Sequence, residues 1–182
     1  MDSKKQTIGI MPFGEIPEIV PKIIAGNIIA YLNLLAEIIP PAENPDYALN
    51  GKRLQYDAGT ILMNLESSCL NNYEKVIGVF DVDLFVPIFS YVFGEAKQGG
   101  KYALVSLFRL KNNPDGSITP SSIFYERAAK VALHELGHLY NLFHCEDKQC
   151  LMHFSGGLED LDETPLYFCR YCTAFFKDAL LR

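Results

Sequence analysis

Residues 134–144 read His-Glu-Leu-Gly-His-Leu-Tyr-Asn-Leu-Phe-His, with three histidines separated by four and then by six positions. A long helix is predicted to lead into this stretch, because Thr119 and Pro120 provide an N-cap and a first helical position. Helical residues four apart are separated by about 40° around the axis and about 6 Å along it. His134 and His138 therefore lie on one stripe, where both imidazoles can bind one metal ion.

Glu135 is displaced around the helix from His134, so its carboxylate can face a metal-bound water without binding the metal. His144 would point away from the other histidines if the helix continued, and the chain must therefore turn back. Asn141 is the predicted helix-ending turn, because asparagine tolerates the left-handed backbone conformation. Three histidine ligands leave the fourth position of zinc open for water, as in catalytic sites. The alternative is a partly exposed helical face without a metal.

Four cysteines follow in the order Cys145-x4-Cys150-x18-Cys169-x2-Cys172. Four thiolates suit tetrahedral zinc, and a Cys-x2-Cys pair is a common metal-binding knuckle. The alternatives are four buried structural cysteines or, in an oxidising compartment, two disulfides. No export signal is recognised, which favours a reducing, cytoplasmic setting and hence a structural zinc site. The fifth cysteine, Cys69, lies on the apolar side of a predicted helix and is expected in the core.

Met152 stands two residues after Cys150, and with it the whole series resembles the archaemetzincins of the metzincin clan of zinc peptidases. Metzincins usually have glycine at the position of Asn141. The resemblance implies one metzincin-like α/β domain over residues 1–182, with a zinc-knuckle subregion at about 145–172. It assigns to Met152 a turn beneath the catalytic metal. Two Zn²⁺ ions are expected, one catalytic and one structural.

The rest of the chain predicts strands alternating with helices, and therefore an α/β fold. A hairpin is predicted from two β-like runs, 89–93 and 102–110, on either side of a Gly-bearing connection. It would add one antiparallel edge strand to a small, mixed, twisted sheet that packs against helices. Other strands are expected at 7–11, 36–39 and 75–80, and helices at 21–35 and 57–70.

Composition and charge exclude several classes of protein. With 49% hydrophobic and 21% charged residues the chain is expected to be globular. Sixteen Lys and Arg against 22 Asp and Glu, with no basic run, argue against nucleic-acid binding. The most hydrophobic segment, 23–39, is interrupted by polar residues and is too short for a membrane span.

These patterns predict a zinc-dependent peptidase that acts on a peptide or protein substrate. His134, His138 and His144 would hold the catalytic zinc, and Glu135 would take a proton from the zinc-activated water as general base. The antiparallel edge strand, placed near 91–93, would bind substrate as an added strand. The alternative is a catalytically silent, zinc-stabilised protein that binds peptides or proteins, although metal retention alone would not require Glu135. The acidic residues at 159–163 are expected to be solvated, or else to favour basic substrates.

Overall fold

A central sheet carries the fold in this computed structural model, which describes residues 7–68 and 70–181. Its five strands lie in the order β2-β1-β5-β8-β7. The first four strands are parallel, and β7 is antiparallel to β8 at one edge. In chain order the bounds are β1 (Thr7–Phe13), β2 (Leu35–Ile38), β5 (Lys75–Phe80), β7 (Gly94–Ala96) and β8 (Tyr102–Ser106).

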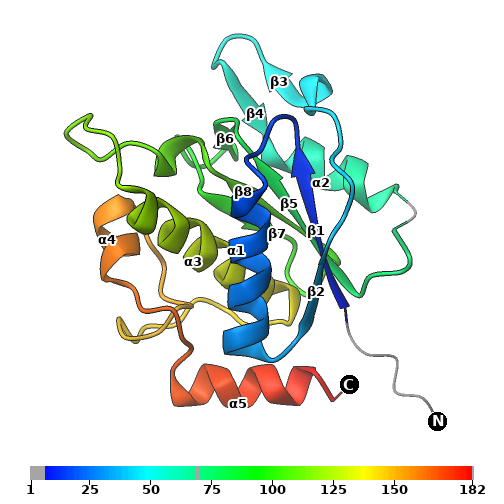
Figure 1. The fold of residues 1–182 in the computed structure, drawn as a ribbon, viewed down its shortest axis with the longest axis vertical. Helices are drawn as coiled ribbons and strands as arrows, with labels where there is room; N and C mark the ends of the chain where they lie inside the picture. Colours follow the sequence, from blue (N-terminus) through cyan, green and yellow to red (C-terminus); the bar gives the residue numbers. More distant parts are fainter. Residues whose placement is uncertain (1–6, 69, 182) are drawn as a thin grey trace.

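Helices cover both faces of this sheet (Figure 1). On one face lie α1 (Ile19–Asn27) and the long α3 (Ser121–Leu139); on the other lies α2 (Ala58–Glu66). Alternation along β5 explains the two cores, because Ile77 and Val79 pack with α1 and α3 whereas Val76 and Phe80 pack with α2. The structure thus confirms a mixed α/β sheet with one antiparallel edge strand.

The remaining elements are short and lie around this framework. A small second sheet contains β3 (Leu49–Asn50), β4 (Gln55–Asp57) and β6 (Leu84–Phe85). Two helices follow α3, namely α4 (Leu158–Glu163) and α5 (Arg170–Ala179). The helix predicted at 21–35 starts earlier and ends earlier: α1 begins at Ile19, a π-helical turn follows at Ile28–Leu32, and Leu35 already begins β2. No helix within the described ranges has both the length and the apolar character that a bilayer crossing requires.

The predicted hairpin is displaced in the structure. Residues 89–93 form no strand, apart from an isolated bridge at Val92, and the antiparallel strand is β7, within the predicted connection. Residues 108–110 form a 3-10 turn rather than an extension of β8. Aromatic residues favour strands, but Phe89, Tyr91 and Phe93 line a cavity instead. The placement of the edge strand near 91–93 was therefore wrong.

The long helix begins one residue later than predicted, at Ser121, after Pro120. Thr119 does not cap it with its side chain; the Thr119 hydroxyl accepts a hydrogen bond from Arg127 Nη1 at 2.9 Å. The prediction that Cys69 lies in the core falls outside the described residues.

Candidate metal centre and active-site cavity

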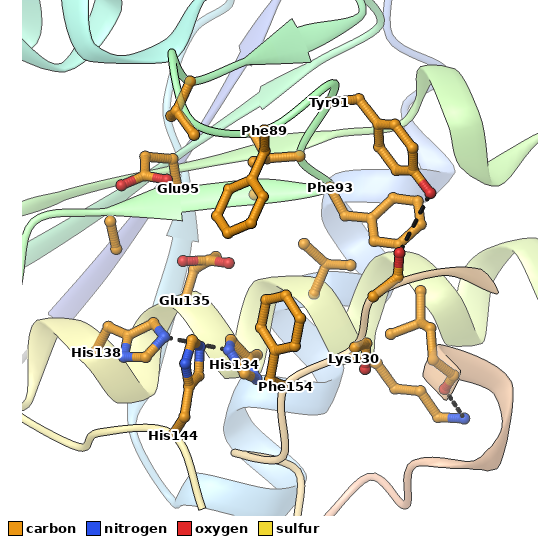
Figure 2. A pocket seen from close by; sticks show the side chains of 18 of the residues that line it. Phe89, Tyr91, Phe93, Glu95, Lys130, His134, Glu135, His138, His144 and Phe154 are labelled. Atoms are coloured by element: carbon orange, nitrogen blue, oxygen red, sulfur yellow. Dashed lines mark hydrogen bonds between the residues drawn. The ribbon is translucent and has the colours of Figure 1, made fainter. Parts of the chain in front are cut away.

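Three imidazoles converge at the C-terminal end of α3 (Figure 2). The Nε2 atoms of His134 and His138 are 3.1 Å apart. The His144 ring centroid is 5.3 Å from that of His134 and 4.9 Å from that of His138. One nitrogen from each ring lies within 4.8 Å of the others, as ligands of a single ion must.

Backbone carbonyls fix which nitrogen of each helical histidine is free. His134 Nδ1 donates to Leu151 O at 2.8 Å, and His138 Nδ1 donates to Leu142 O at 2.8 Å. With the protons on Nδ1, both Nε2 atoms present lone pairs to each other, and no proton lies between them. A cation that accepts both lone pairs removes this repulsion, so the donor set fits Zn²⁺.

The histidine pKa values agree with metal binding, which requires neutral imidazole. Burial, reinforced by the neighbouring His138, lowers the pKa of His134 to about 3. Burial also lowers the pKa values of His138 and His144. The three rings therefore stay uncharged at neutral pH.

The turn after α3 places the third histidine. Asn141 has a φ of 64°, in the left-handed region, and its N–H donates to His138 O at 3.0 Å. The next N–H, of Leu142, donates to Gly137 O at 3.0 Å. This closure of the helix turns the chain toward His144 and also supplies the Leu142 carbonyl that orients His138.

The Glu135 carboxylate lies between the imidazoles and the edge strand β7 (Figure 2). Glu135 is buried, and its carboxylate has no hydrogen-bond or ion-pair partner among residues 7–68 and 70–181. Burial, with a smaller contribution from the charge of Glu95, raises its pKa well above the usual value. A Cβ atom on Gly94 would lie 2.6 Å from Glu135 Cγ, so only glycine lets β7 approach this closely.

A largely apolar cavity of about 640 Å³ adjoins the imidazoles. Its walls come from distant segments, with Phe89, Tyr91 and Phe93 before β7 and Leu151 and Phe154 after the turn. The two walls approach each other where the Tyr91 hydroxyl donates to Gly156 O at 3.4 Å and Phe89 and Phe154 lie 6.1 Å apart between ring centroids. This size suits one large side chain of a ligand together with nearby backbone.

Lys130 lines the same cavity, but its ammonium is fully engaged elsewhere. Lys130 Nζ donates to Leu161 O at 3.1 Å and to Asp162 O at 3.0 Å, and pairs with Glu126 Oε1 at 2.8 Å. An ammonium has three protons, and all three have acceptors here. Only its methylene stem is left to contact a ligand.

The four later cysteines form a second cluster, with all Sγ atoms within 4.8 Å of one another. They are free thiols, and Cys145 Sγ lies 3.9 Å from Cys169 Sγ. Zinc–sulfur bonds of about 2.3 Å in a tetrahedron place sulfurs about 3.8 Å apart, which fits this distance. Burial raises the pKa of Cys150 to about 11, so a cation is needed to hold it as a thiolate.

Comparison with known proteins decides the family. The archaemetzincin of Methanocaldococcus jannaschii is 37% identical over 144 residues, which cover 79% of this chain and 78% of the relative. The model of peptidase family M54 matches residues 30–178. The chain belongs to the archaemetzincins, peptidase family M54. The family resemblance seen in the sequence is thereby confirmed, and this archaemetzincin is a zinc metallopeptidase.

Solved structures agree with this assignment. The archaemetzincin of Methanopyrus kandleri superposes with a TM-score of 0.87 at 30% identity and covers 100% of this chain and 99% of its own. A zinc-dependent peptidase of Methanocorpusculum labreanum gives a TM-score of 0.83 at 28% identity, covering 93% of this chain and 99% of its own. The archaemetzincin fold therefore extends across the whole α/β domain.

Met152 lies beneath the helix that carries the metal-binding histidines. It is fully buried, and a Cβ atom on Gly137 would lie 2.5 Å from its Sδ atom. The Met152 carbonyl accepts a hydrogen bond from Cys145 N at 2.8 Å. Met152 thus contacts α3 with its side chain and the start of the thiol cluster with its backbone.

Glu159 and Glu163 are exposed, as predicted, but Asp160 and Asp162 also make structural contacts in this archaemetzincin. Asp162 accepts two hydrogen bonds from the buried Arg127 guanidinium, both at 2.7 Å, and Asp160 accepts one from Gly156 N at 3.0 Å. They therefore hold α4 and the cavity wall in place. Sequence reasoning also overlooked Gly94 and Glu95, because β7 is brought to the site from a distant part of the chain, and Lys130, because the cavity that it lines is formed by other segments.

Proposed function

We propose that His134, His138 and His144 hold the catalytic Zn²⁺ of this archaemetzincin and that Glu135 is the general base for peptide-bond hydrolysis. When bound, zinc supplies a Lewis acid that lowers the pKa of water and polarises a peptide carbonyl. A second, structural Zn²⁺ would be held by Cys145, Cys150, Cys169 and Cys172. Reduced thiols suit a reducing compartment such as the cytoplasm.

Glu135 moves the proton in this proposal. Its carboxylate lies between the imidazoles and β7, where it can accept a proton from the attacking water and return it to the leaving amine. Burial favours the protonated form and so makes the carboxylate a stronger base than an exposed one. Its isolation from hydrogen-bond donors among the described residues leaves both oxygens available to water and substrate.

The free edge of β7 would hold the peptide backbone. Ser106 N donates to Phe93 O at 2.8 Å, so the backbone groups of Phe93 face β8. Because these groups alternate along a strand, those of Gly94 and Ala96 face the open edge. An extended peptide can pair there as an antiparallel strand, directly beside Glu135.

Three features that occur together in one cavity support this proposal. Two histidines have their Nδ1 protons held by carbonyls. Beside them lie a buried carboxylate and the open edge of β7, neither of which is paired by any residue that the structure describes. A protein that only retained zinc would need neither the carboxylate nor the edge.

Zinc quantification combined with a peptide-library digest tests the proposal on wild type, Glu135→Gln and a control, Glu43→Gln, at an exposed position outside the cavity. We expect two zinc ions in all three proteins. Cleavage should fall at least about 100-fold in Glu135→Gln alone, because it loses general-base catalysis. Two zinc ions without Glu135-dependent cleavage of any peptide would instead support the catalytically silent binding protein.

A further inference from the structure

Glu95 lies at the centre of the edge strand β7 and faces away from α3. It pairs with Leu104, which belongs to the core on the α2 side of the sheet. Its neighbour Gly94 faces Glu135 on the α3 side, as alternation along a strand requires. Glu95 nevertheless lines the active-site cavity, as do its strand neighbours Gly94 and Ala96, and Figure 2 shows its side chain above that of Glu135.

The Glu95 carboxylate has no partner among the residues that the structure describes, neither in an ion pair nor in a hydrogen bond. The cation nearest along the strand, Lys97, is engaged by Glu66 on α2 at 3.0 Å. Glu95 is partly buried, and this burial raises its pKa. A desolvated carboxylate without a partner is costly, and a cation brought by a ligand would offset that cost.

Strand register decides which part of a substrate meets Glu95. A peptide paired antiparallel to β7 places the side chain opposite Glu95 on the same face as Glu95. Because β7 runs from Gly94 to Ala96, an antiparallel peptide runs from the Ala96 end toward Phe93, which lines the cavity beside the imidazoles. The residue opposite Glu95 therefore immediately precedes the residue opposite Gly94, whose side chain enters the cavity. Because Gly94 contacts Glu135, the bond between these two substrate residues lies beside the general base.

Resting on the proposed peptidase function, we propose that Glu95 selects substrates with a cationic group at the residue just before the cleaved bond. A Lys or Arg side chain supplies this group, and so does the free α-amino group of a substrate whose first residue occupies that position. The remaining cation of the cavity, Lys130, is saturated and faces the other side of β7, so it does not oppose this selection.

Peptide cleavage by wild type, Glu95→Gln and Glu95→Lys tests this selection, with Glu43→Gln as the matched control. The peptides differ only at the residue before the cleaved bond, which is Lys, Gln or Glu, and each is made with a free and an acetylated amino terminus. For wild type and control we expect kcat/KM to favour Lys over Gln about tenfold, as for a hydrogen-bonded ion pair. Glu95→Gln should bring this ratio near one, and Glu95→Lys should favour the Glu peptide.

The acetylated peptides identify the source of the cation. A Lys preference that survives acetylation assigns recognition to the side chain, whereas a preference that follows the free amino terminus assigns it to the α-amino group. Equal Lys-to-Gln ratios in wild type and Glu95→Gln would overturn the proposal.

Binding to inactive protein separates this inference from the proposed function. With zinc-loaded Glu135→Ala, fluorescence anisotropy should show tighter binding of the Lys peptide than of the Gln peptide, and adding Glu95→Gln should remove the difference. If the Lys peptide binds more tightly than the Gln peptide but wild type cleaves neither, the peptidase mechanism is wrong and selection by Glu95 still holds. If wild type cleaves the peptides but binds the Lys and Gln peptides equally well, only the proposed selection by Glu95 is wrong.

Discussion

The two clusters of candidate metal ligands differ in their surroundings, although consecutive residues, His144 and Cys145, join them. The imidazole cluster opens into a cavity of about 640 Å³, and His144 is exposed. The thiol cluster lines neither described cavity, and its members Cys150 and Cys172 belong to the main hydrophobic core. Both clusters suit zinc, but only the first leaves room for water and substrate.

The secondary-structure elements around the ligands, rather than the metal itself, decide whether a cluster serves catalysis or stability. The histidines sit where a helix ends and a strand edge is free, so polar groups can approach from solvent. The thiols join the chain after α3 to the start of α5, and thereby close a segment that has little regular structure of its own. Loss of the first site should cost activity, and loss of the second should cost stability.

Removal of one ligand from each cluster gives the largest expected contrast. Cys172→Ser takes a buried ligand from the closed cluster, and we expect a loss of about 3–5 kcal/mol in unfolding free energy. His144→Ala removes an exposed ligand and should abolish activity with less than about 1 kcal/mol of destabilisation. Thermal unfolding followed by circular dichroism, together with zinc content, measures both. A larger destabilisation by His144→Ala would reverse the comparison.

Acidification should affect the imidazole cluster when its zinc has been removed by a mild chelator. Because the pKa of His134 is about 3 when folded, against about 6.5 unfolded, only the unfolded state gains this proton between pH 7 and pH 5. Stability should therefore fall as pH falls, by about 2 kcal/mol at pH 5. Urea titrations at both pH values should show the smaller loss in His134→Gln. Equal losses in the two proteins would contradict the assignment.

Gly137→Ala tests whether the contact of Met152 with α3 supports the imidazole cluster. An added Cβ atom would meet Met152 Sδ at 2.5 Å. Overpacking costs about 1–3 kcal/mol and the better helix propensity of alanine returns about 1, so we expect a net loss of about 1 kcal/mol. Zinc titration should show weaker binding at the imidazoles and unchanged binding at the thiols. Stabilisation by this substitution would exclude the contact.

The smallest effect is expected at the turn between the clusters. Asn141→Gly retains a residue that accepts a φ of 64°, so unfolding free energy should change by less than about 0.5 kcal/mol. Asn141→Ala should cost about 1 kcal/mol, because alanine disfavours this conformation. Urea unfolding of both variants gives the comparison. Equal stability of the two variants would show that the left-handed turn is not required.

Sequence reasoning succeeded where local spacing determines geometry. The strand predicted at 75–80 and the stripe of His134 and His138 both follow from periodicity within one element. It failed at 89–96, because the aromatic residues there look like a strand and Gly94 looks like a turn. Pairing with β8 and packing against Glu135 decide the real strand, and neither contact is local in the sequence. The single-domain assignment with a knuckle at 145–172 stays a prediction.

The saturated Lys130 changes how ligands for this cavity should be chosen. Judged by residue type alone, Lys130 would be expected to bind an acidic group of a ligand. Its three N–H donors, however, are already used by two backbone carbonyls and Glu126. An inhibitor carboxylate placed against Lys130 would lose its bound water without gaining a hydrogen bond from the lysine. A branched alkyl or aryl substituent, laid along the methylene stem, is the better starting point for inhibitor design.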